Sequence, residues 1–505
     1  MKILFFYPNS GSQLGFNYGV AYLAAVLKEA GHEVVFRQLC EDLGPLPGKE
    51  ELIAYVREVA PQIIGFSVVT NQWRYAAELA GWLREAVDVP LVCGGIHATV
   101  AAAEILGTGL FDYVLVGECE EALLEFVDKL AAKEDVKEIR NLGMMVDSKP
   151  RLNPVRPLPD LRSLPFKAYD IFDFQRIIDA KHGWVGLMAS RGCPFQCSYC
   201  FNHFMVGKYR SDLGCTFQEL NYIRHHSVAQ LIDEIAFLEK NYRNITMYIL
   251  DDDLFTFDTD FVAEFCAAYK KVTSLPFVVN GHVGFFDDRR ARLLADAGCR
   301  IVKFGVESGS PKIRSTVMNR HMSNDKIVEA LGHVHRYGMH SSVFIMIGLP
   351  YEEREDVLDT VRFLGRAQPG RFRWTYFFPF PGTESQRLSI EGGYVNPEKA
   401  ESLMNFTDES PLDFGAEHNL FLEKIGRIMP WFVNAHAGFE ASPLFREKSE
   451  ELLAMGREEW DKAFPRLLDE DKRISLQLQD RNLRHYAVKY NPFMGVISDY
   501  FMNEK

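Results

Sequence analysis

Short apolar runs alternate with amphipathic segments along the N-terminal part of the chain. The runs are ILFFY, EVVFRQL, IIGFSVV, PLVCGG and YVLVG, and segments such as YGVAYLAAVLKEAGH between them have the apolar spacing of a helix. This alternation predicts an α/β domain over residues 1–140 with a five-stranded, doubly wound, Rossmann-like parallel sheet. Ligands of such sheets bind at the carboxyl ends of the strands, so we expect the loops after Tyr7, Val69, Gly95 and Gly117 to line a pocket.

A connector and a second alternating segment follow. Residues 141–183 contain RLNPVRPLPDLRSLPFKAYD, whose prolines and mixed charge favour an extended surface linker. In residues 184–389 six apolar runs, from WVGLMAS to WTYFFPF, alternate with helical periods, which predicts a partial (β/α)6 barrel of the TIM type. Residues 390–505 have helical patterns rich in Phe, Trp and Met, and we expect a helical C-terminal cap. A packed cap and a surface that selects the substrate are both compatible with this composition.

Composition and charge narrow the classes of function. The 505 residues include 69 acidic and 56 basic ones, for a formal charge of -13, and no dense Lys/Arg run occurs, which argues against a nucleic-acid substrate. No apolar stretch is long enough to span a membrane and no signal-peptide pattern is present, so we expect a cytoplasmic protein. In that compartment the nine cysteines are expected to be ligands, reactive thiols or core residues instead of disulfides.

Three cysteines are closely spaced after the first strand of the predicted barrel. The sequence SRGCPFQCSYCFN places Cys193, Cys197 and Cys200 in a C-x3-C-x2-C pattern. Closely spaced thiolates hold cubane iron–sulfur clusters, and three ligands leave one iron open for a cofactor or substrate. Zinc is the competing metal, but its structural sites need four ligands, and His203 and Cys215 have no familiar zinc spacing to the triplet. Chance clustering of buried cysteines is the remaining alternative.

The triplet, with Tyr199 at its aromatic position, resembles the signature of the radical S-adenosylmethionine (SAM) superfamily. The resemblance implies that SAM binds the open iron of a 4Fe–4S cluster and is cleaved reductively to a 5'-deoxyadenosyl radical. It also implies a SAM site built from the segments ILDDDLF, FGVESGS, IGLP and FPFPGT. The residues expected at this site are Tyr199, Asp252, Glu307, Ser308, Leu349 and Phe378.

The N-terminal strings GFSVVT, GGIHAT and VGECEEALLE resemble the cobalamin-binding domains of the same superfamily. The D-x-H-x-x-G motif that supplies histidine to cobalt does not occur in residues 1–130, which implies base-off cobalamin without a protein histidine. His97 is then expected at the ligand periphery, with Asn71 and Trp73 below the metal. A domain that retains the fold but no corrinoid is the alternative. The residues expected to bind cobalamin are Ser67, Thr70, Asn71, Trp73, Gly94, Gly95, His97, Thr99, Gly117 and Glu118.

Taken together, the resemblances imply a cobalamin-dependent radical SAM enzyme. The expected activity is methylation of an unactivated carbon or phosphorus in a small molecule, lipid or peptide, with electrons from an external donor such as flavodoxin or ferredoxin. A radical cyclase, ring-contraction or carbon–carbon coupling enzyme is the alternative that uses the same cofactors. A methylthiotransferase-like RNA modifier is disfavoured by the acidic charge, and a non-catalytic carrier by the complete cofactor-binding barrel.

Overall fold

The structure is a computed structural model that describes residues 1–12, 14–396, 409–491 and 496–502. Its residues group into two compact units. The first unit comprises residues 1–195, 200–246 and 380–382, and the second comprises residues 196–199, 247–379 and 383–505. The first unit therefore contains the predicted N-terminal domain, the connector and the first part of the predicted barrel.

The first unit is built around a seven-stranded sheet of order β2-β1-β3-β4-β5-β6-β7. Strands β1 to β5 pair in parallel, as the alternating pattern predicts. The sheet strands are β1 (Lys2–Pro8), β2 (Glu33–Leu39), β3 (Ile63–Ser67), β4 (Leu91–Gly94), β5 (Tyr113–Leu115), β6 (Leu142–Val146) and β7 (Lys149–Leu152).

Strands β6 and β7 form an antiparallel hairpin that extends the parallel sheet at its edge. Sequence analysis assigned these residues to the surface connector, and the structure corrects that assignment. Asp147 and Ser148 join the strands with φ angles of 49° and 60°. Two consecutive positive φ angles are the geometry of a type I′ hairpin turn. The sequence pattern did not reveal the turn because it lacks the usual glycine.

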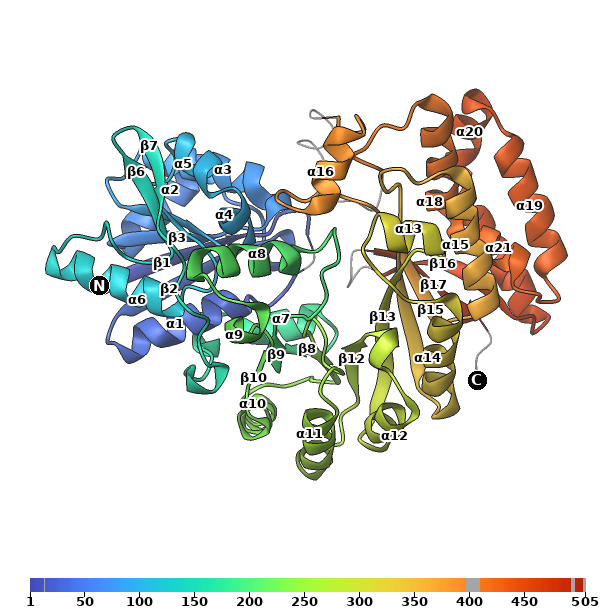
Figure 1. The fold of residues 1–505 in the computed structure, drawn as a ribbon, viewed down its shortest axis with the longest axis horizontal. Coiled ribbons are helices and arrows are strands. Elements are labelled where there is room, and N and C mark those ends of the chain that lie inside the picture. The colour runs from blue at the N-terminus through green and yellow to red at the C-terminus, as the bar shows by residue number, and fades with distance from the viewer. Residues whose placement is uncertain (13, 397–408, 492–495, 503–505) are drawn as a thin grey trace. The chain divides into compact units, whose positions relative to one another are not determined.

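Helices cover both faces of this sheet (Figure 1). Helix α1 packs on α6, and α2 packs on α3. The apolar core extends beyond the N-terminal domain, because Met205, Val206 and Tyr209 of α8 belong to the same buried cluster as Phe6 and Phe66. The first unit contains α1 (Tyr18–Glu29), α2 (Lys49–Val59), α3 (Trp73–Arg84), α4 (Ile96–Val100), α5 (Ala102–Gly107), α6 (Glu120–Ala132), α7 (Phe174–Ala180), β8 (Trp184–Leu187), β9 (Ser190–Arg191), α8 (Phe201–Leu213), α9 (Phe217–Leu220), β10 (Arg224–His225) and α10 (Val228–Asn241).

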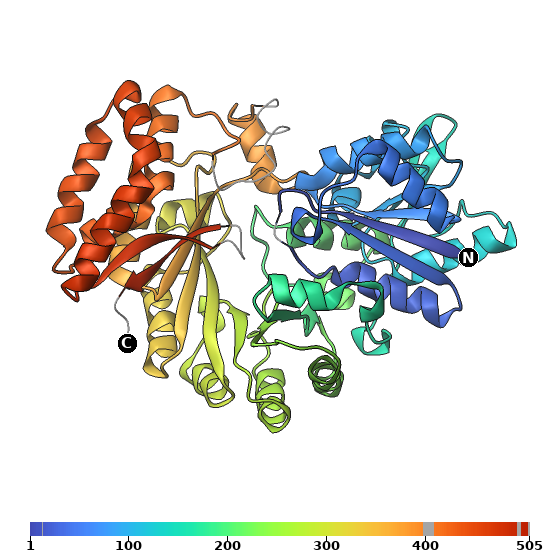
Figure 2. The same ribbon diagram turned by 180° about the vertical axis from the view of Figure 1, so that it is seen from behind.

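The second unit contains a curved sheet in which five neighbouring strands are parallel. These five strands and β8 of the first unit correspond to the six predicted runs. The five strands of the second unit curl into part of a barrel (Figure 2). The parallel strands are β11 (Met247–Leu250), β12 (Phe277–Gly281), β13 (Cys299–Glu307), β14 (His340–Ile347) and β15 (Arg371–Tyr376). Two further strands, β16 (His485–Asn491) and β17 (Val496–Met502), are antiparallel, and β17 pairs with β15.

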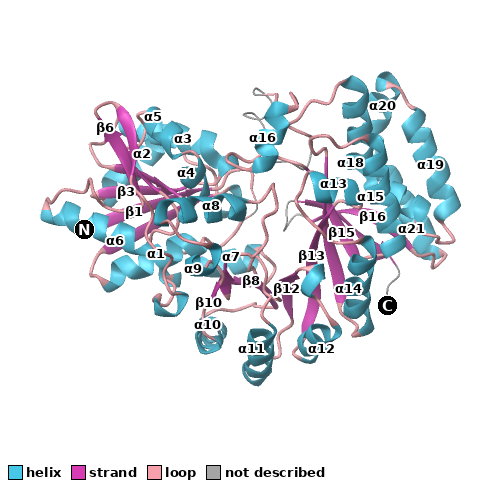
Figure 3. Ribbon diagram, in the orientation of Figure 1, coloured by secondary structure: helices cyan, strands magenta, loops and turns pink. Residues whose placement is uncertain are grey.

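Crossover helices pack on the outer face of the curved sheet, and the C-terminal segment is largely helical, as predicted (Figure 3). The hairpin of β16 and β17 adds two strands that the helical prediction did not include. Parts of the predicted cap, residues 397–408, 492–495 and 503–505, lie outside the described residues. The helices are α11 (Thr259–Val272), α12 (Asp288–Asp296), α13 (Pro311–Thr316), α14 (Asn324–Arg336), α15 (Arg354–Ala367), α16 (Glu384–Glu391), α18 (Ala416–His436), α19 (Ser442–Ala454), α20 (Arg457–Ala463) and α21 (Leu467–Asp480). Within the described part of the chain, no helix combines the length and apolarity needed to cross a membrane.

Candidate cofactor-binding sites

The three clustered cysteines lie on the loop between β9 and α8. Cys193 and Cys200 are half-buried and belong to the first unit, whereas Cys197 is buried and belongs to the second. Gly192 enters the loop with φ 94°, and a Cβ atom there would lie 2.2 Å from the Tyr222 carbonyl oxygen, so only glycine fits. Among the described residues, no three Cys, His, Asp or Glu side chains stand grouped as metal ligands. The ligand set therefore stays a prediction.

Nitrogen donors lie beside the sulfur atoms of Cys200 and Cys197. The Asn202 side-chain amide donates to Cys200 Sγ at 3.7 Å, and the Tyr222 hydroxyl donates to Asn202 Oδ1 at 2.6 Å. The Arg320 guanidinium lies 3.3 Å from Cys197 Sγ. Hydrogen bonds to sulfur stabilise the thiolate form and tune iron–sulfur clusters, so these surroundings fit a cluster.

Arg320 is the main residue of this region that sequence analysis missed. Its side chain is buried, and Nη1 donates to the Tyr199 hydroxyl at 3.2 Å while Nη2 donates to the Gly305 carbonyl oxygen. A single arginine after a short helix gives no periodic signal. Its position in MNRH, soon after FGVESGS, was the available hint. A buried guanidinium beside a cluster cysteine is suited to bind a carboxylate such as that of SAM.

Glu307 forms the second part of this polar group. It ends β13 with φ 70°, a backbone conformation that is rare for a residue with a side chain. Its Oε1 atom would lie 2.2 Å from a Cβ atom on Gly305, so the carboxylate folds back over that glycine. Burial raises the pKa of Glu307, and this rise is opposed by Arg320 and by a hydrogen bond from Tyr199. Tyr199, Glu307 and Arg320 therefore come together as one polar cluster within the second unit.

The other residues predicted to bind SAM have different surroundings. Leu349 is fully buried in an apolar cluster that Tyr199 also contacts, as expected for an apolar wall. Ser308 is fully buried, and its hydroxyl bonds to Thr360 Oγ1 at 3.2 Å and to the Ser310 amide at 3.2 Å, so it stabilises the turn. Asp252 is buried and its carbonyl accepts from Asn280 at 2.8 Å, and Phe378 is half-buried. Their contacts with SAM stay predictions.

The carboxyl ends of β1, β3, β4 and β5 gather polar side chains at one edge of the N-terminal sheet. Gln72 donates to the Ser10 carbonyl at 2.8 Å and to Ser12 Oγ at 2.6 Å, and Asn71 donates to Ser12 Oγ at 3.3 Å. Ser67 accepts from Asn17 at 3.1 Å. The predicted residues Thr70 and Trp73 are half-buried in the same loop. Sequence analysis expected the loop after Tyr7 here but did not name Ser10, Ser12, Asn17 or Gln72.

Two buried polar atoms at this edge fit a ligand that carries amide groups. His97 Nδ1 and Gln72 Oε1 are buried and have no hydrogen-bond partner among the described residues. The His97 ring lies 4.9 Å from the Trp73 ring, centroid to centroid, and burial lowers the pKa of His97 to about 4. The imidazole is therefore neutral near pH 7. Because unpaired buried polar atoms are costly, both atoms suit donors on a corrinoid periphery.

Of the two adjacent glycines in GGIHAT, the protein's own backbone requires glycine at only one position. A Cβ atom on Gly94 would be 3.7 Å from the Phe66 carbonyl oxygen, an ordinary contact, so the protein itself does not require glycine there. Gly95 has φ 95°, and its Cβ would lie 2.7 Å from the Val68 carbonyl oxygen. Both glycines are among the residues that the sequence predicts to bind cobalamin. At Gly95 the neighbouring backbone alone demands glycine.

The loop after β5 is joined to the GGIHAT loop. The Gly117 amide donates to Thr99 Oγ1 at 3.0 Å, and Thr99 in turn donates to the Gly95 carbonyl at 3.0 Å. Glu118, by contrast, directs its carboxylate toward Arg191 and Arg224. Of the residues predicted to bind cobalamin, Glu118 is thus engaged by other parts of the protein.

Two family models match the chain. The model of the B12 binding domain matches residues 10–127, and the model of the radical SAM superfamily matches residues 187–364. The first match covers the strand-edge loops and the second begins just before the cysteine loop. The chain therefore belongs to the cobalamin-binding radical SAM enzymes, as its sequence predicts. Their cofactors are a 4Fe–4S cluster, SAM and cobalamin.

Curated relatives of this chain include methyltransferases and a cyclase. An uncharacterized methyltransferase of Pyrococcus horikoshii is 26% identical over 431 residues, which cover 81% of this chain and 89% of that protein. The cytidylyl-2-hydroxyethylphosphonate methyltransferase of Streptomyces wedmorensis is 25% identical over 77% of this chain and 80% of its own length. The anaerobic magnesium-protoporphyrin IX monomethyl ester cyclase of Cereibacter sphaeroides is 25% identical over 76% of this chain and 63% of its own length.

Solved structures with the same fold include two cobalamin-dependent radical SAM enzymes. TsrM from Kitasatospora setae, solved with tryptophan and a SAM analogue, has a TM-score of 0.63 and 18% identity, covering 77% of this chain and 76% of TsrM. OxsB with aqua-cobalamin and SAM has a TM-score of 0.66 and 14% identity, covering 95% of this chain and 74% of OxsB. These similarities confirm the fold.

Proposed function

We propose that this protein is a methyltransferase that acts on an unactivated carbon or phosphorus atom of a small molecule, lipid or peptide. The observation that carries the proposal is that one chain combines the B12-binding and radical SAM domains. In addition, two relatives that align with more than three quarters of this chain are methyltransferases. When bound, the cluster with SAM supplies a carbon-centred radical and the corrinoid supplies a methyl group.

The chain's own residues would hold these groups in place. Cys193, Cys197 and Cys200 are the proposed cluster ligands. Arg320 would bind the SAM carboxylate while Glu307 accepts hydrogen bonds from its polar groups. Gln72 and His97 are suited to bind the corrinoid periphery. A reduced flavodoxin or ferredoxin is the proposed electron donor, and the cytoplasm is the proposed location.

A cyclase or another radical rearrangement is the second candidate. It is favoured by the 25% identity to the magnesium-protoporphyrin ester cyclase. Both candidates use the same cofactors and the same cleavage of SAM. They differ in the product, because only methyl transfer adds a carbon to the substrate.

Labelled SAM separates these candidates. The reconstituted enzyme is incubated under anaerobic conditions with a reductant, SAM carrying a trideuterated methyl group, and an extract of the source organism lacking the enzyme. We expect a new product that carries the intact trideuteromethyl group, formed only when cobalamin is present. Untargeted mass spectrometry detects the product. A cobalamin-dependent product without the label would favour the cyclase, and a labelled product formed without cobalamin would contradict the proposal.

A further inference from the structure

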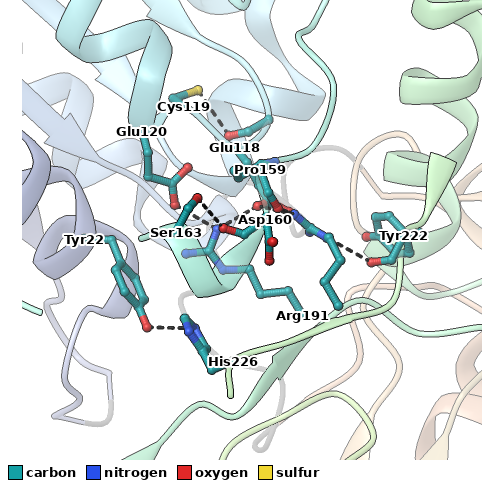
Figure 4. Close-up of polar contacts among 12 residues, drawn as sticks. Tyr22, Glu118, Cys119, Glu120, Pro159, Asp160, Ser163, Arg191, Tyr222 and His226 are labelled. Atoms are coloured by element: carbon teal, nitrogen blue, oxygen red, sulfur yellow. Dashed lines mark hydrogen bonds and ion pairs between the residues drawn. The ribbon is translucent and has the colours of Figure 1, made fainter. Parts of the chain in front are cut away.

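The carboxylate of Glu118 forms ion pairs with two arginines of the first unit, Arg191 and Arg224. Figure 4 labels Glu118 and Arg191. Arg191 Nη1 is 2.7 Å from Glu118 Oε2, and Arg224 Nη2 is 2.5 Å from Glu118 Oε1. A side-chain exposure of 15% for Glu118 and Arg191, and of 5% for Arg224, shows that the group is largely shielded from water. Burial alone would raise the pKa of Glu118, but the two arginines lower it, so the carboxylate is ionised.

The two arginines are neighbours on paired strands. Arg191 in β9 is directly opposite Arg224 in the antiparallel strand β10. Like charges opposite one another destabilise a strand pair unless anions compensate them. Glu118 contacts both arginines, and Glu120 Oε1 lies 2.8 Å from Arg191 Nη1. Glu118, from the loop after β5, and Glu120, the first residue of α6, thus balance the charges of the two arginines on β9 and β10.

Arg191 is the last residue of β9 and directly precedes the cysteine loop. Gly192 and Cys193 follow it directly in the sequence, and Gly192 is fixed by close packing against Tyr222. Arg224 is held in addition by the Pro159 carbonyl oxygen, to which it donates at 2.8 Å. The position of Cys193 therefore depends on a guanidinium that Glu118 anchors.

The backbone of Glu118 also contacts α8, the helix that follows the cysteine loop. Its amide donates to the Tyr209 hydroxyl at 2.8 Å, and Tyr209 belongs to α8, which begins directly after Cys200. A Cβ atom on Gly117 would lie 2.4 Å from the same hydroxyl, so the glycine allows α8 to approach. Gly117 is in turn bonded to Thr99 of the GGIHAT loop. One short segment thus joins the corrinoid-binding edge to the strand before the cysteine loop and to the helix after it.

We propose that Glu118 is a positioning residue that fixes the cysteine loop relative to the corrinoid-binding edge of the N-terminal sheet, and that it does not bind cobalamin itself. This inference rests on the proposed function, because it matters only if both cofactors act in one reaction. A methyl group and a substrate radical must meet at short range, and small displacements from a remote residue can cost about 100-fold in rate. Within the first unit, the carboxylate therefore positions the residues on either side of the cysteine loop relative to the corrinoid-binding edge.

A Glu118→Gln variant tests the inference, with Glu234→Gln as the matched control. Glu234 is a more deeply buried acid of the first unit, with a side-chain exposure of 5%, and both of its oxygens lie 2.6 Å from Lys167 Nζ. Loss of its charge disturbs a buried ion pair that, among the described residues, makes no hydrogen bond to the cysteine loop, although Lys167 and Arg191 both lie over the Tyr22 ring. If Glu118→Gln alone does not fold, the double variant Glu118→Gln with Arg224→Gln restores the balance of charge and takes its place.

The measured quantity is the relaxation of the cob(II)alamin electron spin. In the wild type, the paramagnetic reduced cluster is expected to speed the relaxation of the cob(II)alamin electron spin, and this effect falls steeply with distance. We expect Glu118→Gln to retain cobalt and iron but to lose the enhancement, so that the microwave power at half-saturation falls toward the value measured with the oxidised cluster. Glu234→Gln should keep the wild-type value.

Several outcomes would overturn the inference. Loss of cobalt with retention of iron in Glu118→Gln would make Glu118 a cobalamin-binding residue. An unchanged enhancement would remove its positioning role, and an equal loss in Glu234→Gln would show only a general loss of stability. Absence of cobalt from the wild type would instead contradict the proposed function, and the inference would fall with it.

Discussion

Replacement of Cys193, Cys197 and Cys200 together by alanine is expected to abolish both the cluster and the cleavage of SAM. No thiolate then remains on the loop to hold iron. Iron analysis of the anaerobically reconstituted variant should find none of the cluster iron, and chromatography should find no 5'-deoxyadenosine after reduction. Retention of four irons per chain by the variant would show that the cluster lies elsewhere.

Cysteines outside the loop provide the matched controls. Cys266 and Cys299 are buried in the second unit, and burial raises the pKa of Cys266 to about 12 and that of Cys299 further still. Both thiols stay protonated at neutral pH and are poor metal ligands. Single changes of either residue to serine should leave the iron content and the visible spectrum unchanged.

Replacement of Arg320 by methionine is expected to raise the SAM concentration at half-maximal cleavage by about 10- to 100-fold. Loss of a charge-assisted hydrogen bond costs about 1.5–3 kcal/mol, and each 1.4 kcal/mol is about tenfold in affinity. Arg320→Lys should recover only part of this loss, because lysine keeps the charge but not the planar fork. The rate of 5'-deoxyadenosine formation against SAM concentration measures the effect.

Arg314 serves as the control for this change. Its side chain is fully buried and donates to the Ser308 and Met322 carbonyls and to Asn324, and within the described part of the chain it makes no hydrogen bond to the cysteine loop. Arg314→Met should lower thermal stability but leave the half-saturating SAM concentration near that of the wild type. Equal SAM dependence of the two variants would contradict the role assigned to Arg320.

The fold was predictable because periodicity is a local signal. Apolar runs that alternate with amphipathic helices define both the parallel sheet of the first unit and the strands of the partial barrel. The β6–β7 hairpin escaped prediction, since its turn residues Asp147 and Ser148 are not the usual Asn-Gly or Asp-Gly pair. The added strands β16 and β17 follow a long helical segment, so the helical pattern masked them.

In the candidate sites, only the residues that belong to local sequence motifs could be predicted. The cysteine triplet is a local motif, so its spacing alone predicts an iron–sulfur cluster. Arg320 and Glu118 depend on partners distant in sequence, and no spacing rule relates Glu118 to Arg191 or Arg224. The motif of Glu118 therefore predicts corrinoid binding, whereas its carboxylate contacts Arg191, just before the cysteine loop, and Arg224 on the paired strand β10. Tertiary contacts decide the roles of such residues.

The central claim is that this one chain holds a corrinoid and an iron–sulfur cluster together. Anaerobic reconstitution with iron, sulfide and hydroxocobalamin, followed by gel filtration and metal analysis, tests it most directly. The account predicts about four irons and close to one cobalt per chain, with a base-off cobalamin spectrum that His97→Ala leaves unchanged. Retention of iron without cobalt, or a His97→Ala spectrum that reports the loss of an axial nitrogen, would contradict it.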